Sequence, residues 1–198
     1  MANTNGSWGL RPVAKVGQNS NSTGVTGYTT YEIANANSNV IYQGSPVIPL
    51  STGYIDIVGA AGGGSVGLIG SFQGCRYVAS TTGKPTWSMY WPGSGADSNH
   101  PIRCFVADDP MQIFSIATDA TWTSKATARA GVYANADFAT VSTINTTNTL
   151  NLRILGWEED AMNEDFAAAG IPVLVRLNNH FNSSNGAAAA GTVSTTGI

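Results

Sequence analysis

Two glycine-rich segments have spacings that could bind the phosphates of a nucleotide. Residues Gly62–Gly67 fit the pattern G-x-G-x-x-G and follow a strand pattern. In dinucleotide-binding folds the last glycine opens a helix whose N-terminus holds the pyrophosphate. Here residues 68–72 continue as a strand, and no acidic residue follows at the required spacing of about 20 residues, so we interpret the segment as a hairpin loop. Gly83-Lys84 resembles the end of a P-loop, but Pro85 replaces the hydroxyl residue that would bind magnesium.

Histidine and carboxylate residues could bind a metal ion or act as a general acid and base. His100 and His180 are far from each other and from both cysteines in the sequence. Asp108-Asp109 and the acidic run Glu158–Asp160 could supply the carboxylate pair of a glycoside hydrolase. Adjacent carboxylates in turns are usually solvated corner residues, and no G-x-S-x-G nucleophile pattern is found. We therefore predict no catalytic residue, no metal site and no cofactor, and a protein that is not an enzyme.

The two cysteines, Cys75 and Cys104, both lie in apolar strand patterns and outside any C-x-x-C pair. A zinc site therefore has no support. The favoured interpretation is that both are small buried side chains. A disulfide between them stays open, because spacing alone does not settle connectivity.

A long segment, Ser80–Pro101, has no periodicity of its own and contains Trp87, Tyr90 and Trp91. Loops of this length usually have a function or cover another part of the protein. Its aromatic side chains could stack on sugar rings, because aromatic faces suit pyranose rings. The commoner use of such side chains is to close one end of a β-barrel, and we favour that interpretation.

The clearest strand patterns lie near the C-terminal end. Apolar and polar residues alternate in Leu150–Leu155 and in Pro172–Asn178. A period of two is typical of half-buried strands. In the acidic, alanine-rich connection between them, residues 160–169 are predicted to form one or two helical turns that end at Gly170.

Further strands are predicted at short intervals along the chain. They cover residues 25–34, 54–58, 66–72, 75–79, 102–107 and 111–117, with a bulge at Gly74. Residues 42–50 are apolar, but Pro46 and Pro49 cannot donate to a ladder, so we predict an edge strand or a loop there. Residues 118–130 could form a short helix. The predicted fold is all-β, a compact antiparallel β-barrel or sandwich with an extended N-terminal arm and at most one or two short helices.

Three parts of the chain are distinguished by composition. We predict an extended N-terminal arm over residues 1–24, a β domain over residues 25–182, and a flexible C-terminal tail over residues 183–198. The arm carries the apolar residues Trp8, Leu10 and Val13, together with Arg11, which the following proline keeps out of a helix. Such an arm needs a surface to lie on, and the sequence leaves open whether this is its own domain or a neighbouring subunit.

Charged residues are scarce. They make up 11% of the chain, against about 25% in an average soluble domain. The net charge of −3 and the lack of a basic cluster argue against nucleic-acid binding. No apolar run is long enough to span a bilayer, and the N-terminus does not have the pattern of a secretory signal. Low surface charge also means weak repulsion between copies, which suits a protein that packs against others.

Several short pieces of sequence, taken together, resemble a known family. In chain order they are Gly9–Val13, Phe105–Pro110 followed by Phe114, Asn135–Asp137, Ser142–Thr147, Leu150–Leu155, Asn163-Glu164 and Val173–His180. Their order and spacing, over roughly residues 1–182, resemble a family of small structural proteins of tailed bacteriophages, common in marine phages and cyanophages. Residues 156–160 and the alanine-rich tail depart from the family pattern, in which a more basic strand exit is expected.

The resemblance implies a virion structural protein, most plausibly a capsid decoration or cement protein. Such proteins bind the outside of the assembled head, stabilise contacts between capsomers, and usually form homotrimers. The implied partners are the major capsid protein and further copies of this chain, with neither nucleic acid nor membrane. The implied location is the capsid surface of the virion, after synthesis in the host cytoplasm. We predict that Trp8, Leu10, Arg11 and Val13 make the partner contacts, because Trp and Arg are favoured interface anchors.

Three other functions are alternatives. A tail or receptor-binding module would use the loop that contains Trp87, Tyr90 and Trp91 to bind glycans. A major capsid subunit usually needs a longer chain with a long helix, which the sequence does not predict. A glycan hydrolase is the third alternative.

Overall fold

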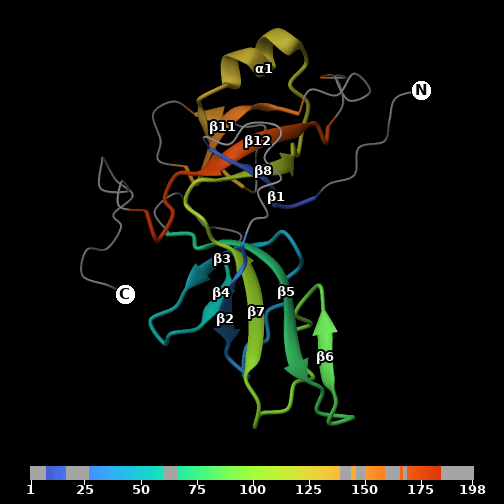
Figure 1. Ribbon diagram of the computed structural model, residues 1–198. Coiled ribbons are helices and arrows are strands. Elements are labelled where there is room, and N and C mark those ends of the chain that lie inside the picture. The colour runs from blue at the N-terminus through green and yellow to red at the C-terminus, as the bar shows by residue number, and fades with distance from the viewer. Residues whose placement is uncertain are drawn as a thin grey trace.

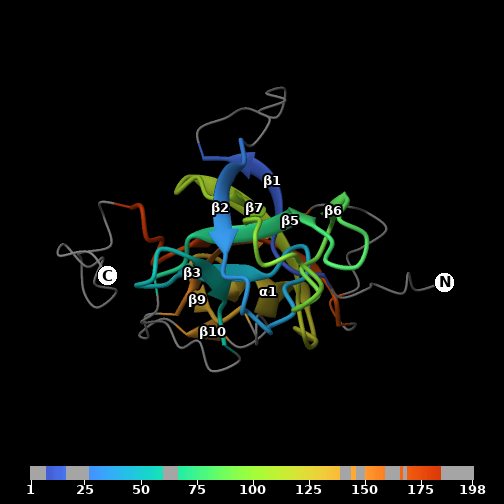
Figure 2. The same ribbon diagram turned by 90° about the horizontal axis from the view of Figure 1, so that it is seen from below.

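The structure is a computed structural model and describes residues 8–16, 27–59, 67–138, 144–145, 150–158, 166 and 169–183. These residues form two antiparallel sheets, here called sheet A and sheet B, and one short helix. Figure 1 shows sheet A with the helix at one end of the molecule and sheet B at the other. In the view from below, β2, β5 and β7 of sheet B lie in front (Figure 2). The predicted all-β fold is confirmed, and it is a sandwich of two sheets without a closed barrel in the described part.

Sheet A has six strands in the order β1-β8-β12-β11-β9-β10. They are β1 (Arg11–Lys15), β8 (Gln112–Ala117), β9 (Asn135–Ala136), β10 (Ile144–Asn145), β11 (Leu152–Trp157) and β12 (Pro172–Leu177). The central pair, β11 and β12, is the one with the clearest alternation in the sequence. Leu152 lies opposite Leu177 and Ile154 opposite Val175, and all four side chains are buried. The predicted inside face of this pair is therefore confirmed.

Helix α1 (Lys125–Gly131) covers one end of sheet A. It starts at Ser124, whose hydroxyl accepts a hydrogen bond of 3.2 Å from the backbone N–H of Thr127 and so satisfies a donor of the first turn. The short helix predicted within residues 118–130 is confirmed. The helical turns predicted for residues 160–169 lie almost entirely outside the described residues.

Sheet B runs in the order β2-β7-β5-β3-β4, and β6 pairs with the far end of β5. Its strands are β2 (Thr29–Ile33), β3 (Pro46–Pro49), β4 (Ile55–Ile57), β5 (Gly70–Val78), β6 (Pro85–Ser88) and β7 (Ile102–Ala107). The pairing of β5 with β7 shifts between Phe72 and Gly74, and Gly74 has a φ of 137° that side chains rarely adopt. The bulge predicted at Gly74 is confirmed.

Each sheet covers a separate apolar core. The core under sheet A also takes in side chains from outside its strands, including Leu10, Val58, Leu68, Trp122, Ala128 and Phe166. The core under sheet B contains Ile33, Ile41, Val47, Ile55, Phe72, Cys75, Trp91, Ile102, Cys104 and Val106. Leu10, Val58 and Leu68 enter the first core from chain segments that are bonded to sheet B, so the two cores meet at the junction between the sheets.

Two predictions about sheet B are wrong. Residues 42–50 were expected at an edge or in a loop, but β3 lies between β5 and β4. The prolines are tolerated because Pro46 and Pro49 are the first and last residues of β3, and β5 pairs only with the Pro46 end. Residues 80–101 were expected to be one irregular loop, but they contain β6, which is only four residues long and begins at Pro85.

Candidate functional site

The N-terminal segment joins the two sheets. The backbone N–H of Leu10 donates to the carbonyl of Gly44 at 2.8 Å, and the hydroxyl of Ser71, on β5, donates to the carbonyl of Leu10 at 2.6 Å. One residue later, at Arg11, the chain enters β1 and pairs with β8 of sheet A. The described part of the predicted arm therefore lies on its own domain.

A close contact between two glycines fixes this junction. A Cβ atom on Gly9 would lie 2.5 Å from the carbonyl oxygen of Gly44, which is closer than real Cβ atoms come. Gly44 itself has a φ of 86°, in the left-handed region that favours glycine. The backbone of residue 9 reaches residue 44 because neither residue carries a side chain.

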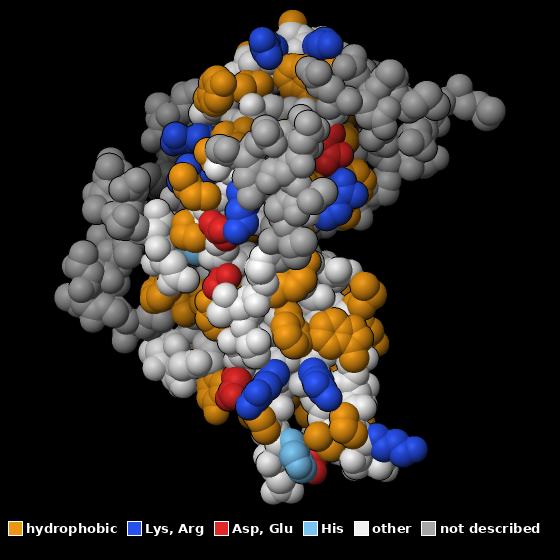
Figure 3. Space-filling model, viewed as in Figure 1, with side chains coloured by type: hydrophobic (Ala, Val, Ile, Leu, Met, Phe, Trp, Pro, Cys, Tyr) orange, Lys and Arg blue, Asp and Glu red, His pale blue; other side chains and the backbone are white. Residues whose placement is uncertain are grey.

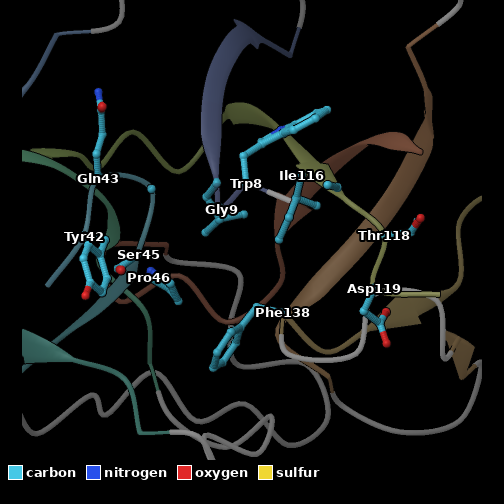
Figure 4. A pocket seen from close by; sticks show the side chains of 13 residues that line it. Trp8, Gly9, Tyr42, Gln43, Ser45, Pro46, Ile116, Thr118, Asp119 and Phe138 are labelled. Atoms are coloured by element: carbon cyan, nitrogen blue, oxygen red, sulfur yellow. The ribbon is translucent and has the colours of Figure 1, made fainter. Parts of the chain in front are cut away.

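Two hollows lie on either side of the segment from Trp8 to Leu10. The larger one, here called the waist cleft, has a volume of about 320 Å³. Its wall includes Trp8, Tyr42, Pro46, Ile116 and Phe138, so that both sheets contribute to it (Figure 4). The smaller hollow, of about 300 Å³, is lined by Trp8–Arg11, Gln43, Gly44 and Gln73. Trp8 is common to both.

The four residues predicted to contact partners have different environments. Leu10 is fully buried in the core of sheet A, so its side chain positions the segment and is not accessible to a partner. Trp8 is half-buried, and its indole N–H, which is shielded from solvent, has no hydrogen-bond partner among the residues that the structure describes. Arg11 lies over the Trp8 ring, 5.6 Å from its centroid, and forms an ion pair of 3.1 Å with Glu158. Val13 lies at the register shift of β1 and is exposed.

A stacked pair of tyrosines continues the surface beside the waist cleft. The ring centroids of Tyr42 and Tyr90 are 6.1 Å apart with 23° between the ring planes. Tyr42 is 62% exposed and also lines the cleft, while Tyr90 is 47% exposed. Two aromatic side chains on the surface next to an apolar cleft form the kind of patch that marks interaction sites.

The aromatic side chains of residues 80–101 lie in three different parts of the structure. Trp91 is fully buried in the core of sheet B, where it contacts the edge of the Tyr77 ring at 5.5 Å and donates its indole N–H to the carbonyl of Asn37. Tyr90 belongs to the tyrosine stack, and Trp87 lies on the opposite face of sheet B from the core. The three side chains therefore do not form one sugar-stacking loop.

The acidic residues in the turn after β7 have structural partners. Asp108 accepts hydrogen bonds from the hydroxyls of Thr29 and Tyr31 at 2.8 and 2.7 Å. Burial and this carboxylate raise the pKa of Tyr31. Asp109 forms an ion pair with Lys15 that lowers the pKa of the carboxyl, and it caps the turn by accepting from the N–H of Met111. These contacts fasten the turn between β7 and β8 to β1 and β2.

The histidines lie in different environments. Nδ1 of His100 is 3.2 Å from a carboxylate oxygen of Asp97, on the surface. His180 is buried, accepts the backbone N–H of Asn182, and has its pKa lowered by burial. Among the residues that the structure describes, no three His, Cys, Asp or Glu side chains are grouped so that they could hold a metal ion.

Cys75 and Cys104 are both buried and free, as the favoured interpretation predicted. They lie directly opposite each other on β5 and β7. Burial raises the pKa of each thiol to about 12, so both stay protonated at neutral pH. They serve as small apolar side chains of the core.

Comparison of the chain with protein-family models, with curated proteins and with solved structures finds no match. No helix in the described part of the chain is long and apolar enough to cross a membrane.

The sequence pointed to Trp8 and Arg11 but missed the residues opposite them. Tyr42 and Gly44 lie in a segment that was interpreted only through its prolines. The available signal was Gly44 itself, since an isolated glycine next to a strand can mark a close backbone approach.

Proposed function

We propose that this chain is a virion structural protein of a tailed bacteriophage, most plausibly a capsid decoration or cement protein. It binds the outside of the assembled head, contacts the major capsid protein, and does so as a homo-oligomer, most plausibly a trimer. Its proposed location is the virion surface. The sequence resemblance suggests this role, and the low charge of the chain agrees with a protein that packs against neighbours.

One observation supports a contact surface more than any other. The half-buried Trp8 lines both hollows, and the exposed Tyr42–Tyr90 stack borders the larger one. Exposed aromatic side chains beside an apolar cleft are typical of interface anchors.

The physical role follows from mass action. A protein that binds the assembled shell and not its separated subunits stabilises the shell by a free energy that grows with the logarithm of its concentration relative to its Kd. An oligomer gains further, because its second and third contacts form at high effective concentration. Neither effect requires any chemical reaction.

The structure determines which variants can test this proposal. Deleting residues 1–24 would remove the whole predicted arm, but the deletion would also remove β1 and the buried Leu10. Single substitutions are therefore the better test. We expect Trp8→Ala to keep the fold and to weaken binding to purified heads at least tenfold.

Tyr54→Ala is a matched control, since it removes a partly exposed aromatic side chain outside both hollows. Binding is measured by cosedimentation with heads that lack the protein. If Trp8→Ala binds like the wild type, the waist cleft is not the contact surface. If heads without the protein resist heat as well as complete heads, the proposed stabilising role is wrong.

A further inference from the structure

A row of four side chains crosses the outer face of sheet B. The strand register places Glu32 opposite Arg103, Arg103 opposite Arg76, and Arg76 opposite Trp87, over β2, β7, β5 and β6 in turn. Alternation puts their neighbours Cys75 and Cys104 on the core side, so this row points outward. Figure 3 shows paired basic side chains beside hydrophobic ones over these strands.

Arg76 and Arg103 face each other across β5 and β7. Like charges directly opposite on neighbouring strands destabilise a sheet. The chain has 9 basic residues, and four of them form two such cross-strand pairs, Arg76 with Arg103 here and Arg153 with Arg176 in sheet A; only the pair in sheet B has an exposed Trp next to it in the register. Neither guanidinium forms an ion pair with any residue that the structure describes, Glu32 included. An anion bound between them would remove the repulsion.

Trp87 provides a flat apolar surface at the end of the row. A Cβ atom on Gly74 would lie 2.9 Å from the Trp87 ring, so the ring lies across the bulge in β5. Its centroid is 5.2 Å from that of Phe105, with 53° between the ring planes. The side chain is nevertheless 56% exposed. The ring is therefore held against the sheet while much of its surface is open to solvent.

A shallow hollow lies next to the arginines. It has a volume of about 290 Å³ and is lined by the two arginines together with Tyr77, Val78, Pro85, His100 and Pro101. Its walls are mostly apolar, and no acidic side chain is among its lining residues; His100, one of them, is paired with Asp97. It has room for a small group such as a carboxylate with part of a ring.

We propose that this face binds a saccharide that carries carboxylate groups. A pyranose ring stacks on Trp87, and its carboxylate is held between the guanidinium groups of Arg76 and Arg103. Guanidinium groups bind carboxylates through paired hydrogen bonds, and aromatic faces suit the apolar faces of sugar rings. An acidic peptide would not need the open ring, and a nucleic acid would need a longer basic track than one arginine pair. The site shares no side chain with the waist cleft, so it is independent of the capsid proposal.

The test uses trigalacturonate and its methyl ester, two probes with the same rings and different charge. Isothermal titration of the full chain is expected to show binding of trigalacturonate and at least tenfold weaker binding of the ester. Higher salt is expected to weaken trigalacturonate binding, because exposed charges are screened. A glucuronate-containing oligosaccharide and sialyllactose are titrated in parallel to find the preferred acidic sugar.

Variants separate the two parts of the site. Arg76→Gln and Arg103→Gln are each expected to weaken binding of the acidic sugar at least tenfold, and so is Trp87→Ala. Lys84→Gln, which removes an exposed charge from the turn before β6, is the matched control and is expected to leave binding unchanged. Thermal unfolding of each variant checks that the fold is intact.

Four results would overturn the proposal. The first three are the absence of binding for all three acidic saccharides at millimolar concentration, equal binding of trigalacturonate and its ester, and binding that survives Arg76→Gln and Arg103→Gln. Polyglutamate that binds equally well to the wild type and Trp87→Ala would assign the arginine pair to acidic peptides instead, which also overturns it.

Discussion

Sheet A and sheet B put their apolar residues to different uses. In sheet A the alternating apolar residues of β11 and β12 are buried, as the sequence pattern requires. Both sheets have an arginine pair on the outer face, Arg153 opposite Arg176 in sheet A and Arg76 opposite Arg103 in sheet B, but in sheet B the exposed ring of Trp87 lies beside the pair. Core packing explains the inner faces of both sheets. It does not explain the exposed ring of Trp87 beside the arginine pair of sheet B, and this combination makes the outer face of sheet B a candidate binding surface.

The largest difference in stability between the two faces is expected when two phenylalanines are each replaced by alanine. Phe114 on β8 is fully buried, whereas Phe105 on β7 is half-buried on the outer face. We expect Phe114→Ala to lower the free energy of unfolding by about 3–5 kcal/mol, because it leaves a cavity in the core. Phe105→Ala should cost about 1–2 kcal/mol, because part of its surface is already in water. Urea unfolding measures both values, and equal losses would contradict the assignment of the two faces.

A substitution at the junction between the sheets should lower the unfolding free energy almost as much as one in the core. Gly9→Ala places a Cβ atom against the carbonyl of Gly44, and we expect the backbone shift to cost about 1–3 kcal/mol of unfolding free energy. Gly156→Ala is the matched control, since a Cβ atom there would meet nothing within 4 Å. If both variants unfold at the same urea concentration, the glycine contact does not hold the junction.

As the pH is lowered, the first loss of stability is expected from protonation of His180. The described chain makes an isolated parallel bridge between Leu68 and His180, and the buried imidazole has a pKa below its usual value of about 6.5. The unfolded chain therefore binds a proton more readily than the folded one. Stability is complete above the unfolded pKa and falls as the pH drops from about 6.5 through the folded value, by at most about 1.4 kcal/mol per pH unit.

The variant His180→Gln should flatten this part of the stability–pH curve. The ion pair of Asp109 with Lys15 would be lost only at lower pH, because the pKa of Asp109 is lowered from its usual acidic value. Urea unfolding at a series of pH values measures the curve. An unchanged slope between pH 6.5 and 5 in His180→Gln would contradict the role of this histidine.

The smallest effect on stability is expected at Arg11. Its ion pair with Glu158 is on the surface, and the arginine side chain is 59% exposed. Arg11→Gln should change the unfolding free energy by less than about 1 kcal/mol. If Arg11 is nevertheless a contact residue, the same variant should bind heads more weakly. Unchanged head binding would remove Arg11 from the proposed contact surface.

The sequence predicted the strands that have one apolar and one polar face. It missed the short strands that form only because a neighbouring strand offers them hydrogen-bonding partners. Residues 150–155 and 172–178 alternate because one side is buried, so the pattern is visible in the chain itself. β3 and β6 are four residues each and contain prolines, and they form strands because β5 offers hydrogen-bonding partners at both of its ends. The bulge at Gly74 was predictable because a glycine inside a strand pattern often marks a bulge.

The candidate sites were only partly predictable for a similar reason. Trp8, Arg11 and Val13 stood out as unusual residues in a polar segment, but the burial of Leu10 depends on contacts with residues 44 and 71, which no local pattern reveals. The arginine row of sheet B depends on the register of four strands, and its members are separated by up to 71 positions in the printed sequence, from Glu32 to Arg103. The register depends on which strands pair with each other, and a single sequence does not show this pairing.

The joining of both sheets by the first described residues has a consequence for how the chain folds. Ala14 accepts a hydrogen bond from the side chain of Gln112, 98 positions later, and β1 has its partner in the same distant strand. Such long-range pairing is slow to form because a large loop must close first. β1 can therefore pair only after β8 has been synthesised, and we expect it to join sheet A late in folding.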